Sequence, residues 1–211
     1  AAAFSFGVSR FRIRGYDADN FVSYMNGAPI ENLDNGFTPF NLWSGLNDVT
    51  RFRDNSHGLA SNTFTFGEIG GASAYDTRAS KIRKQIRLSY AASNRTYDNR
   101  IMGTYATGVL KNGWAVALTA TRRWAKEGYV PGTFYDSWSY YGSVDKGIGL
   151  KNNIAFTFMG APTRNGRASS AIQEMRDLAG TNYYNPNWGF QNGEVRNASV
   201  ATSHQPLFIL T

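Results

Sequence analysis

His57 and His204 are the side chains best suited to acid–base or metal chemistry. They lie far apart in the sequence, and neither stands in the His-Glu-x-x-His spacing that brings two imidazoles to one metal ion. The chain has no cysteine, which excludes a thiol nucleophile and thiolate zinc sites. No Gly-x-Ser-x-Gly elbow and no Gly-x4-Gly-Lys-Ser/Thr phosphate loop occurs. We therefore expect no catalytic residue, no metal site and no cofactor, and predict that the chain is not an enzyme.

Two short motifs resemble ligand loops only faintly. Asp17-x-Asp19 with Asn20 has the acidic start of a calcium loop, but glycine is missing at its sixth position and glutamate at its twelfth. The glycine-rich run Gly67–Gly71 lacks the downstream helix and acidic residue of a dinucleotide site. We expect a solvated turn at the first motif and close packing at the second.

The charge distribution separates two parts of the chain. The net charge is +7, yet residues 1–77 carry 5 basic and 8 acidic side chains, whereas residues 78–100 carry 7 basic and 1 acidic. Basic positions 81, 83 and 87 alternate with apolar positions 82, 86 and 88, which is typical of the polar face of a strand. We therefore expect no nucleic-acid partner.

Beyond residue 78 the hydropathy alternates with the period of a β-strand. One face of each segment carries aromatic and branched residues, and the other carries Ser, Thr, Asn, Arg, Gly and Ala. No run approaches the roughly 18 apolar residues of a membrane-spanning helix. The predicted strands are Gln85–Ala91, Arg100–Val109, Trp114–Trp124, Ser137–Lys146, Asn153–Gly160 and a sixth that starts near Asn197.

The connections between these strands alternate in length. Lys111–Gly113 is a tight turn, whereas Ala161–Arg196 is very long and contains one helical candidate, Ser169–Leu178, with a serine cap and a stop at Gly180. Short turns at one end and long loops at the other are typical of outer-membrane barrels, in which strands of about ten residues cross the bilayer. A soluble β-sandwich also fits the period.

Residues 1–77 predict a small α+β unit. Arg10–Tyr16 and Phe21–Met25 are short strand candidates, and Asn26-Gly27 is a turn. Leu42–Arg53 is predicted as a short amphipathic helix that passes into a strand, and Gly58–Gly71 as a loop.

Short motifs occur in order along both parts of the chain. They are RIRGY at Arg12–Tyr16, MNGAPI at Met25–Ile30, Leu46-Asn47-Asp48-Val49 with Arg51, FGEIGG at Phe66–Gly71, Tyr75-Asp76-Thr77-Arg78, and Arg83-Lys84-Gln85. With these motifs the chain resembles TonB-dependent outer-membrane transporters, most closely those of Bacteroidetes, in which Arg83-Lys84-Gln85 would open the barrel. The resemblance covers nearly the whole chain, and Asn26 stands where the family more often has aspartate.

The resemblance implies a fold, a location and partners. Residues 1–80 would be the later part of a plug domain, and residues 81–211 the first five or six strands of a barrel of about 22 strands in the bacterial outer membrane. Relatives import iron chelates, haem, cobalamin, glycans or peptides, driven by the TonB complex through an N-terminal box that is absent from this chain. Lipid would surround the barrel, and the sequence leaves open both the substrate and a surface lipoprotein partner. We expect a fragment of a longer protein, because Gln205–Thr211 ends within a strand-like run.

The resemblance also suggests where substrate would bind. In the plug loop Asp34–Phe40 the candidate ligand contacts are Asn35, Phe37 and Phe40, with packing of the Phe side chains beneath the turn as the alternative. In the predicted extracellular loops the candidates are Tyr129, Phe134, Tyr135, Tyr183, Tyr184 and Trp188, which could instead pack within their own loops.

Two other classes of protein fit parts of the pattern. A soluble all-β carbohydrate- or ligand-binding module would need a closed two-sheet core. A passive porin-like barrel or an adhesin would lack the unit formed by residues 1–77, so that unit discriminates against this class.

Overall fold

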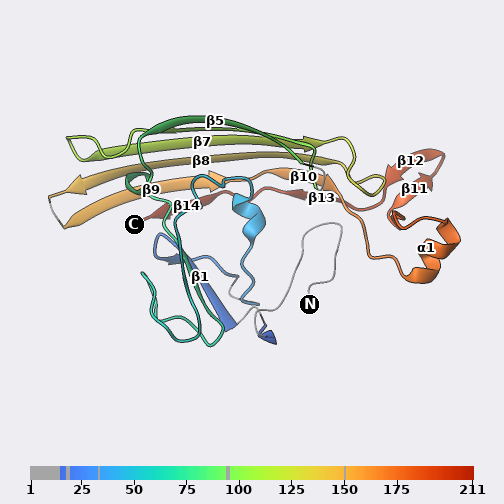
Figure 1. Ribbon diagram of the computed structural model, residues 1–211, viewed down its shortest axis with the longest axis horizontal. Coiled ribbons are helices and arrows are strands. Elements are labelled where there is room, and N and C mark those ends of the chain that lie inside the picture. Colours follow the sequence, from blue (N-terminus) through green and yellow to red (C-terminus); the bar gives the residue numbers. More distant parts are fainter. Residues whose placement is uncertain (1–14, 18–19, 33, 94–95, 150) are drawn as a thin grey trace.

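The computed structural model describes residues 15–17, 20–32, 34–93, 96–149 and 151–211. The chain is mainly β, as predicted, and forms two connected parts (Figure 1). We call residues 15–82 the N-terminal unit and the sheet that follows it the large sheet. The predicted strand Arg10–Tyr16 lies almost entirely outside the described residues.

The N-terminal unit contains a four-stranded sheet in the order β2-β1-β4-β3. Strand β1 pairs in parallel with β4, and β2 and β3 pair antiparallel at the two edges. Asn26 and Gly27 turn the chain between β1 and β2 with φ angles of 51° and 87°, the left-handed values that a tight two-residue hairpin needs. This confirms the predicted turn, and β1 confirms the predicted strand Phe21–Met25. The bounds are β1 Phe21–Met25, β2 Ala28–Pro29, β3 Arg53–Ser56 and β4 Gly71–Tyr75.

Leu42–Arg53 was predicted as a short helix that passes into a strand; the strand is confirmed by β3, which begins at Arg53, but the helix is wrong. Only a single 3-10 turn, η3 (Phe40–Trp43), forms there, and the chain then runs through turns to β3. Gly45 has a φ of 92°, which no right-handed helix can contain, so the helix cannot continue. The apolar spacing that suggested a helix arises because Trp43, Leu46 and Val49 are all buried in turns.

The large sheet has the order β13-β10-β8-β7-β6-β5, with β9 between β8 and β14. Strands β9 and β10 both pair with β8, each with a different part of its length. In the same way β13 pairs with β10 and β14 pairs with β9, so the sheet is six strands wide. Five or six were predicted. The bounds are β5 Gln85–Ala92, β6 Asn99–Ala106, β7 Trp114–Ala125, β8 Tyr135–Ile148, β9 Asn152–Gly160, β10 Thr163–Gly166, β13 Val200–Ser203 and β14 Leu207–Leu210.

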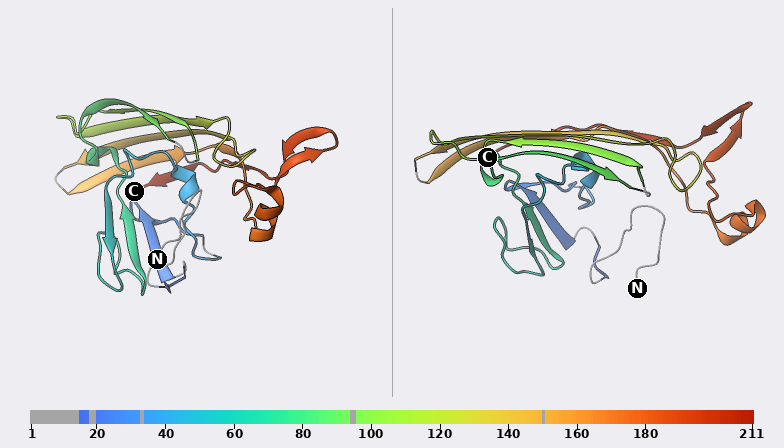
Figure 2. Two further views of the ribbon diagram at one scale, coloured as in Figure 1. Left: turned by 45° about the vertical axis from the view of Figure 1, so that its right-hand side comes forward. Right: turned by 45° about the horizontal axis from the view of Figure 1, so that its top comes forward.

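The two faces of the large sheet differ in polarity, as the alternation predicts. We call the face toward the N-terminal unit the inner face and the opposite one the outer face; the sheet arches over the unit (Figure 2). Between the two ends of the sheet, outer-face side chains are mainly apolar and exposed, with Ile86 at 86% and Leu88 at 80%. Inner-face side chains are small or polar and buried, for example Thr119, Ser139 and Thr157.

One buried cluster joins the two parts. Met25, Leu46 and Tyr75 of the N-terminal unit pack with Tyr141 and Met159 of the large sheet. The inner face is therefore covered by the N-terminal unit. Within the described ranges, no helix has the length and apolar character needed to cross a membrane.

The loop between β10 and β13 holds a helix and a hairpin at one end of the sheet, on the right in Figure 1. Helix α1 (Gln173–Ala179) ends at Gly180, whose φ of 64° makes the predicted stop. The predicted serine cap is wrong: Ile172 takes the cap position, and Ser169 hydrogen-bonds Asn187 instead. The hairpin pairs β11 (Trp188–Gln191) with β12 (Glu194–Asn197).

Candidate functional site

Segment 44–45 of the N-terminal unit is held by the inner face through hydrogen bonds. Arg123 Nη2 donates to both the carbonyl and the hydroxyl oxygen of Ser44 at 2.9 Å, and the Ser139 hydroxyl donates to the same carbonyl at 2.7 Å. The Thr121 hydroxyl donates to the Gly45 carbonyl at 3.1 Å. A Cβ atom on Gly45 would lie 2.8 Å from Arg123 Nε, so this close approach needs glycine.

A second contact is charged and centres on Asp48. This buried carboxylate accepts from Arg87 Nη1 on β5 at 3.0 Å, from Arg51 Nη2 at 3.2 Å and from the Thr104 hydroxyl on β6 at 3.1 Å. Both oxygens are therefore satisfied, and the charge is neutralised. We call this group the Asp48 contact.

A third contact uses neutral groups beside the β1–β2 turn. Asn26 Oδ1 accepts from the backbone N–H of Thr77 at 2.7 Å, and Asn26 Nδ2 donates to Thr157 Oγ1 on β9 at 3.4 Å. The Tyr141 hydroxyl donates to the Thr77 carbonyl. Asn26, the departure from the family motif, thus bonds both parts of the molecule.

Two residues near the end of the N-terminal unit have shifted pKa values. Burial raises the pKa of the Tyr75 phenol, while the Arg53 guanidinium, 5.2 Å from its ring centre, acts in the opposite direction. The hydrogen bond to Asp76 raises the pKa of Arg78, and the two side chains form an ion pair at 2.6 Å.

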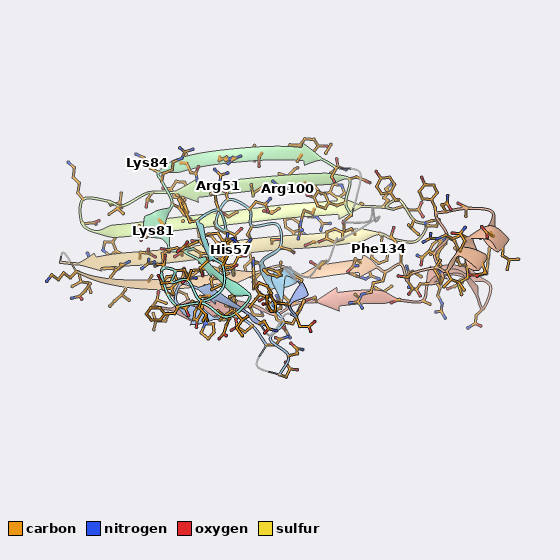
Figure 3. All side chains as sticks on the ribbon, turned by 60° about the horizontal axis from the view of Figure 1, so that its bottom comes forward. Arg51, His57, Lys81, Lys84, Arg100 and Phe134 are labelled. Atoms are coloured by element: carbon orange, nitrogen blue, oxygen red, sulfur yellow. The ribbon has the colours of Figure 1, made fainter. Side chains whose placement is uncertain are left out.

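An arginine pair lies on the inner face toward the loop end of the sheet. Arg100 on β6 is directly opposite Arg123 on β7. The Arg123 guanidinium carbon lies 5.8 Å from the ring centre of Tyr97 and 5.4 Å from that of Tyr135, and the two rings are 6.0 Å apart. Figure 3 shows Arg100 on the side of the sheet that faces the N-terminal unit, with Phe134 farther toward the loops. We call Arg100 and Arg123 the inner arginine pair.

The three plug-loop candidates lie at an exposed turn. Asn35 Oδ1 accepts from the Phe37 N–H at 3.0 Å and so shapes the turn. Phe37 is 40% and Phe40 49% exposed, and Phe40 makes an edge contact with the buried Trp43 at 5.8 Å. Both Phe rings therefore keep a solvent-facing surface, and Asn35 is committed to the turn.

The six loop aromatics fall into a group of three that pack against neighbouring side chains or backbone and a group of three that are more exposed. Phe134 packs under Arg164 at 5.3 Å, Tyr135 packs on Tyr97, and the Trp188 ring lies against Gly132, where a Cβ would be 2.3 Å away. The other group is more exposed, from 38% to 45%: Tyr129, Tyr183 and Tyr184.

Asparagines tie the long loop to its neighbour. Asn185 Nδ2 donates to the Pro131 carbonyl at 2.8 Å, and Asn197 Nδ2 donates to the Gly132 carbonyl at 3.0 Å. Both also donate to the Arg167 carbonyl, at 3.4 and 2.9 Å. These hydrogen bonds fix the backbone of the loop that carries the exposed tyrosines Tyr183 and Tyr184.

The inner arginine pair, Tyr97 and Ser44 are not among the site residues that the sequence motifs predict. A usable signal existed for Arg123, because in strand alternation the consecutive residues Arg122 and Arg123 must face opposite sides. Nothing in the sequence places Ser44 against it, since the two are 79 residues apart.

Charged and aromatic residues mark both ends of the outer face. Near the loops, Arg122 pairs with Asp136 and lies 4.9 Å from the Trp138 ring centre. Near the turns, Lys146 lies 5.1 Å from the ring centre of Trp114. Trp138 and Lys146 are eight residues apart on β8, which corresponds to about 26 Å along the strand.

A solved structure has a similar fold. It is the crystal structure of the siderophore receptor PiuA from Acinetobacter baumannii, with a TM-score of 0.52 and 18% sequence identity, covering 79% of this chain and 23% of that chain. This chain thus spans about a quarter of the receptor's length. No family model and no curated protein matches the sequence. At this identity the likeness is one of fold: the N-terminal unit under an arched antiparallel sheet is an arrangement found in part of a siderophore receptor.

Proposed function

We propose that this chain is part of a plugged outer-membrane transporter of the TonB-dependent type, which imports a nutrient. The observation that carries the proposal is the inverted polarity of the large sheet. Its polar inner face is hydrogen-bonded to the N-terminal unit, and its apolar outer face is exposed. Soluble proteins rarely expose contiguous apolar surface beyond a few hundred Å², whereas a lipid-facing barrel must do so.

The ends of the outer face support the same assignment. Transmembrane barrels carry an apolar band about 25 Å tall between aromatic girdles. Between Trp138 and Lys146 the outer-face positions of β8 are Tyr140, Gly142 and Val144, with no charged side chain among them. Strand tilt of about 35–45° reduces the spacing of about 26 Å along the strand to roughly 20 Å across the membrane, which is close to the height of the band.

The edges of the large sheet support a longer barrel. Among the described strands, β5 pairs only with β6, and β13 and β14 each pair on one side. Lipid cannot satisfy open backbone amides, so a sheet in the membrane must close on itself. We therefore propose further strands in the complete protein, with residues 1–80 as plug and 81–211 as the first barrel strands.

The proposed substrate and partners are those of the family that the motifs resemble and of the solved neighbour. The neighbour is a siderophore receptor, so an iron chelate is one candidate, beside haem, cobalamin, glycans and peptides. The exposed Phe37, Phe40, Tyr129, Tyr183 and Tyr184 are proposed ligand contacts. The TonB complex is the proposed energy source and membrane lipid the proposed surroundings. The Bacteroidetes type rests on the sequence motifs alone, and a surface lipoprotein stays a proposal.

The first test is where the natural polypeptide resides and how large it is. We expect peptides of this chain in the outer-membrane fraction of its source, within a protein several times heavier than 23.4 kDa. A soluble 23.4-kDa species would contradict the proposal and favour a soluble binding module.

A second test asks whether the N-terminal unit must move for import. Because the described contacts bring Ser44 next to Ser139 and the chain has no cysteine, the pair Ser44→Cys with Ser139→Cys should form a disulfide between unit and sheet. We expect energised uptake to stop and to recover on reduction. Ser44→Cys with Ser169→Cys is the control, and unchanged uptake by the cross-linked protein would contradict the plug assignment.

A further inference from the structure

Three arginines lie on the inner face along neighbouring strands, and they differ in whether a carboxylate neutralises their charge. Arg87 on β5 is neutralised in the Asp48 contact. Arg100 on β6 and Arg123 on β7 belong to none of the ion pairs found among the described residues. The inner arginine pair is therefore cationic and lacks a carboxylate partner in the described part of the chain.

The position of the pair makes this unusual. Arg100 and Arg123 are directly opposite each other in the register of β6 and β7, where cross-strand Cβ atoms are about 5 Å apart and like charges destabilise the sheet. Arg123 is only 7% exposed. Both Nε atoms are buried without a hydrogen-bond partner, although Arg123 Nη2 bonds Ser44 and Ser137. Burying charge and leaving donors unmet are both unfavourable unless something satisfies them.

We infer that the inner arginine pair is a binding site for an oxyanion, a carboxylate or a phosphate group carried by the imported molecule. The inference rests on the proposed function, since it names the chemistry of that function's substrate. Guanidinium groups present planar donor forks that match carboxylate and phosphate oxygens, and an anion between two arginines removes their mutual repulsion.

The surroundings suit an anion carried by a larger molecule. The Tyr97 and Tyr135 rings flank Arg123 and offer aromatic surface beside the charge. Arg100 is partly exposed and is the member that an arriving anion meets first. The position of Arg123 is fixed by its hydrogen bonds to Ser44. An anion bound to the pair would therefore lie next to segment 44–45, through which the N-terminal unit is hydrogen-bonded to the sheet.

The test uses the full natural polypeptide, purified in detergent, with citrate and pyrophosphate as probes in titration calorimetry. We expect saturable, salt-sensitive binding of at least one probe, and binding roughly tenfold weaker or more in Arg100→Gln. The affinity of Arg100→Lys for the probe should lie between those of the wild type and Arg100→Gln, because lysine keeps the charge but lacks the planar donor fork of the guanidinium. The matched control is Arg122→Gln, which removes the neighbouring arginine on the outer face and should leave the binding constant unchanged.

The outcomes separate the inference from the proposed function. Preference for citrate identifies a carboxylate, and preference for pyrophosphate identifies a phosphate. No binding of either probe, or equal binding by wild type, Arg100→Gln and Arg122→Gln, overturns the site. Because calorimetry needs no transport, this result is independent of whether the protein resides in the outer membrane.

Discussion

Arg122 and Arg123 are consecutive residues in β7, yet they lie in two different surroundings. Arg122 is on the outer face, beside Trp138 and paired with Asp136 at the end of the apolar band. Arg123 is on the inner face, almost fully buried, and bonds the backbone of the N-terminal unit. One strand therefore serves two environments, with apolar side chains outside and polar side chains inside.

The difference between the faces also explains how the N-terminal unit is held. Polar bonds dominate the contact: the segment at Ser44, the Asp48 contact and the Asn26 side chain. Hydrogen bonds between the N-terminal unit and the inner face can be exchanged for bonds to water, so this contact is compatible with displacement of the unit. Between its charged ends the outer face carries mainly apolar side chains, which make no such bonds.

The sharpest test of the comparison replaces Leu118, at the centre of the outer face, with arginine. If lipid covers this face, Leu118→Arg should lower the free energy of unfolding by about 2–4 kcal/mol. The measurement is denaturant unfolding of the complete protein in lipid vesicles. On a water-exposed face the change would be close to neutral, and that result would contradict a lipid-facing outer face. Leu118→Ala controls for lost side-chain volume.

Gly45→Ala tests the closest approach on the inner side. The φ of 92° and the 2.8 Å approach to Arg123 Nε leave no room for a methyl group, so docking of the N-terminal unit should weaken by about 1–3 kcal/mol. Limited proteolysis of the unit in the folded protein measures this. Gly180→Ala is a matched control, because that glycine also has positive φ but faces open space. Equal protease sensitivity of the two variants would contradict the contact.

Asp48→Asn tests the charged contact. The amide keeps the shape but loses the charge that Arg87 and Arg51 meet, and because both arginines are about half exposed they can return to water. We expect docking to weaken by about 1–2 kcal/mol, with less salt dependence than in the wild type. Asp34→Asn, on an exposed loop, serves as the control. A salt dependence unchanged by Asp48→Asn would show that the ion pair does not hold the unit.

The smallest expected effect is a pH dependence at Tyr75. Its pKa is raised above the ordinary value near 10, so the folded state holds this proton more tightly than the unfolded state. The contribution to stability is full below pH 10 and is lost as the pH rises through the folded-state pKa. Absorbance titration of wild type against Tyr75→Phe should show the missing phenol titrating above pH 10. A missing phenol that titrates at or below pH 10 would contradict the buried setting.

Most of the large sheet could be predicted because each strand carries its own alternation. Trp114, Leu118 and Trp124 share a face, as the spacing indicates, and Gly180 ends the loop helix. Prediction failed where tertiary contacts override local pattern. Gly45 breaks the expected helix because the chain must approach Arg123. The expected loop Gly58–Gly71 forms, but the sequence pattern does not predict strand β4 directly after it, which forms because β1 and β3 pair with it. Residue type alone indicates the exposed loop tyrosines, but three of the six loop aromatics are packed.

The β class, the two faces of each strand and the turn residues could be predicted from the sequence, because these depend on neighbours within a few positions. The motifs that suggest a transporter are also features of the sequence. Three facts become visible only in the folded molecule: the polar face is the one that faces the N-terminal unit, Ser44 contacts Arg123, and Arg100 lies opposite Arg123 without a carboxylate among the described residues. These contacts join distant segments, and their energies depend on burial and charge that exist only once the sheet has closed over the N-terminal unit.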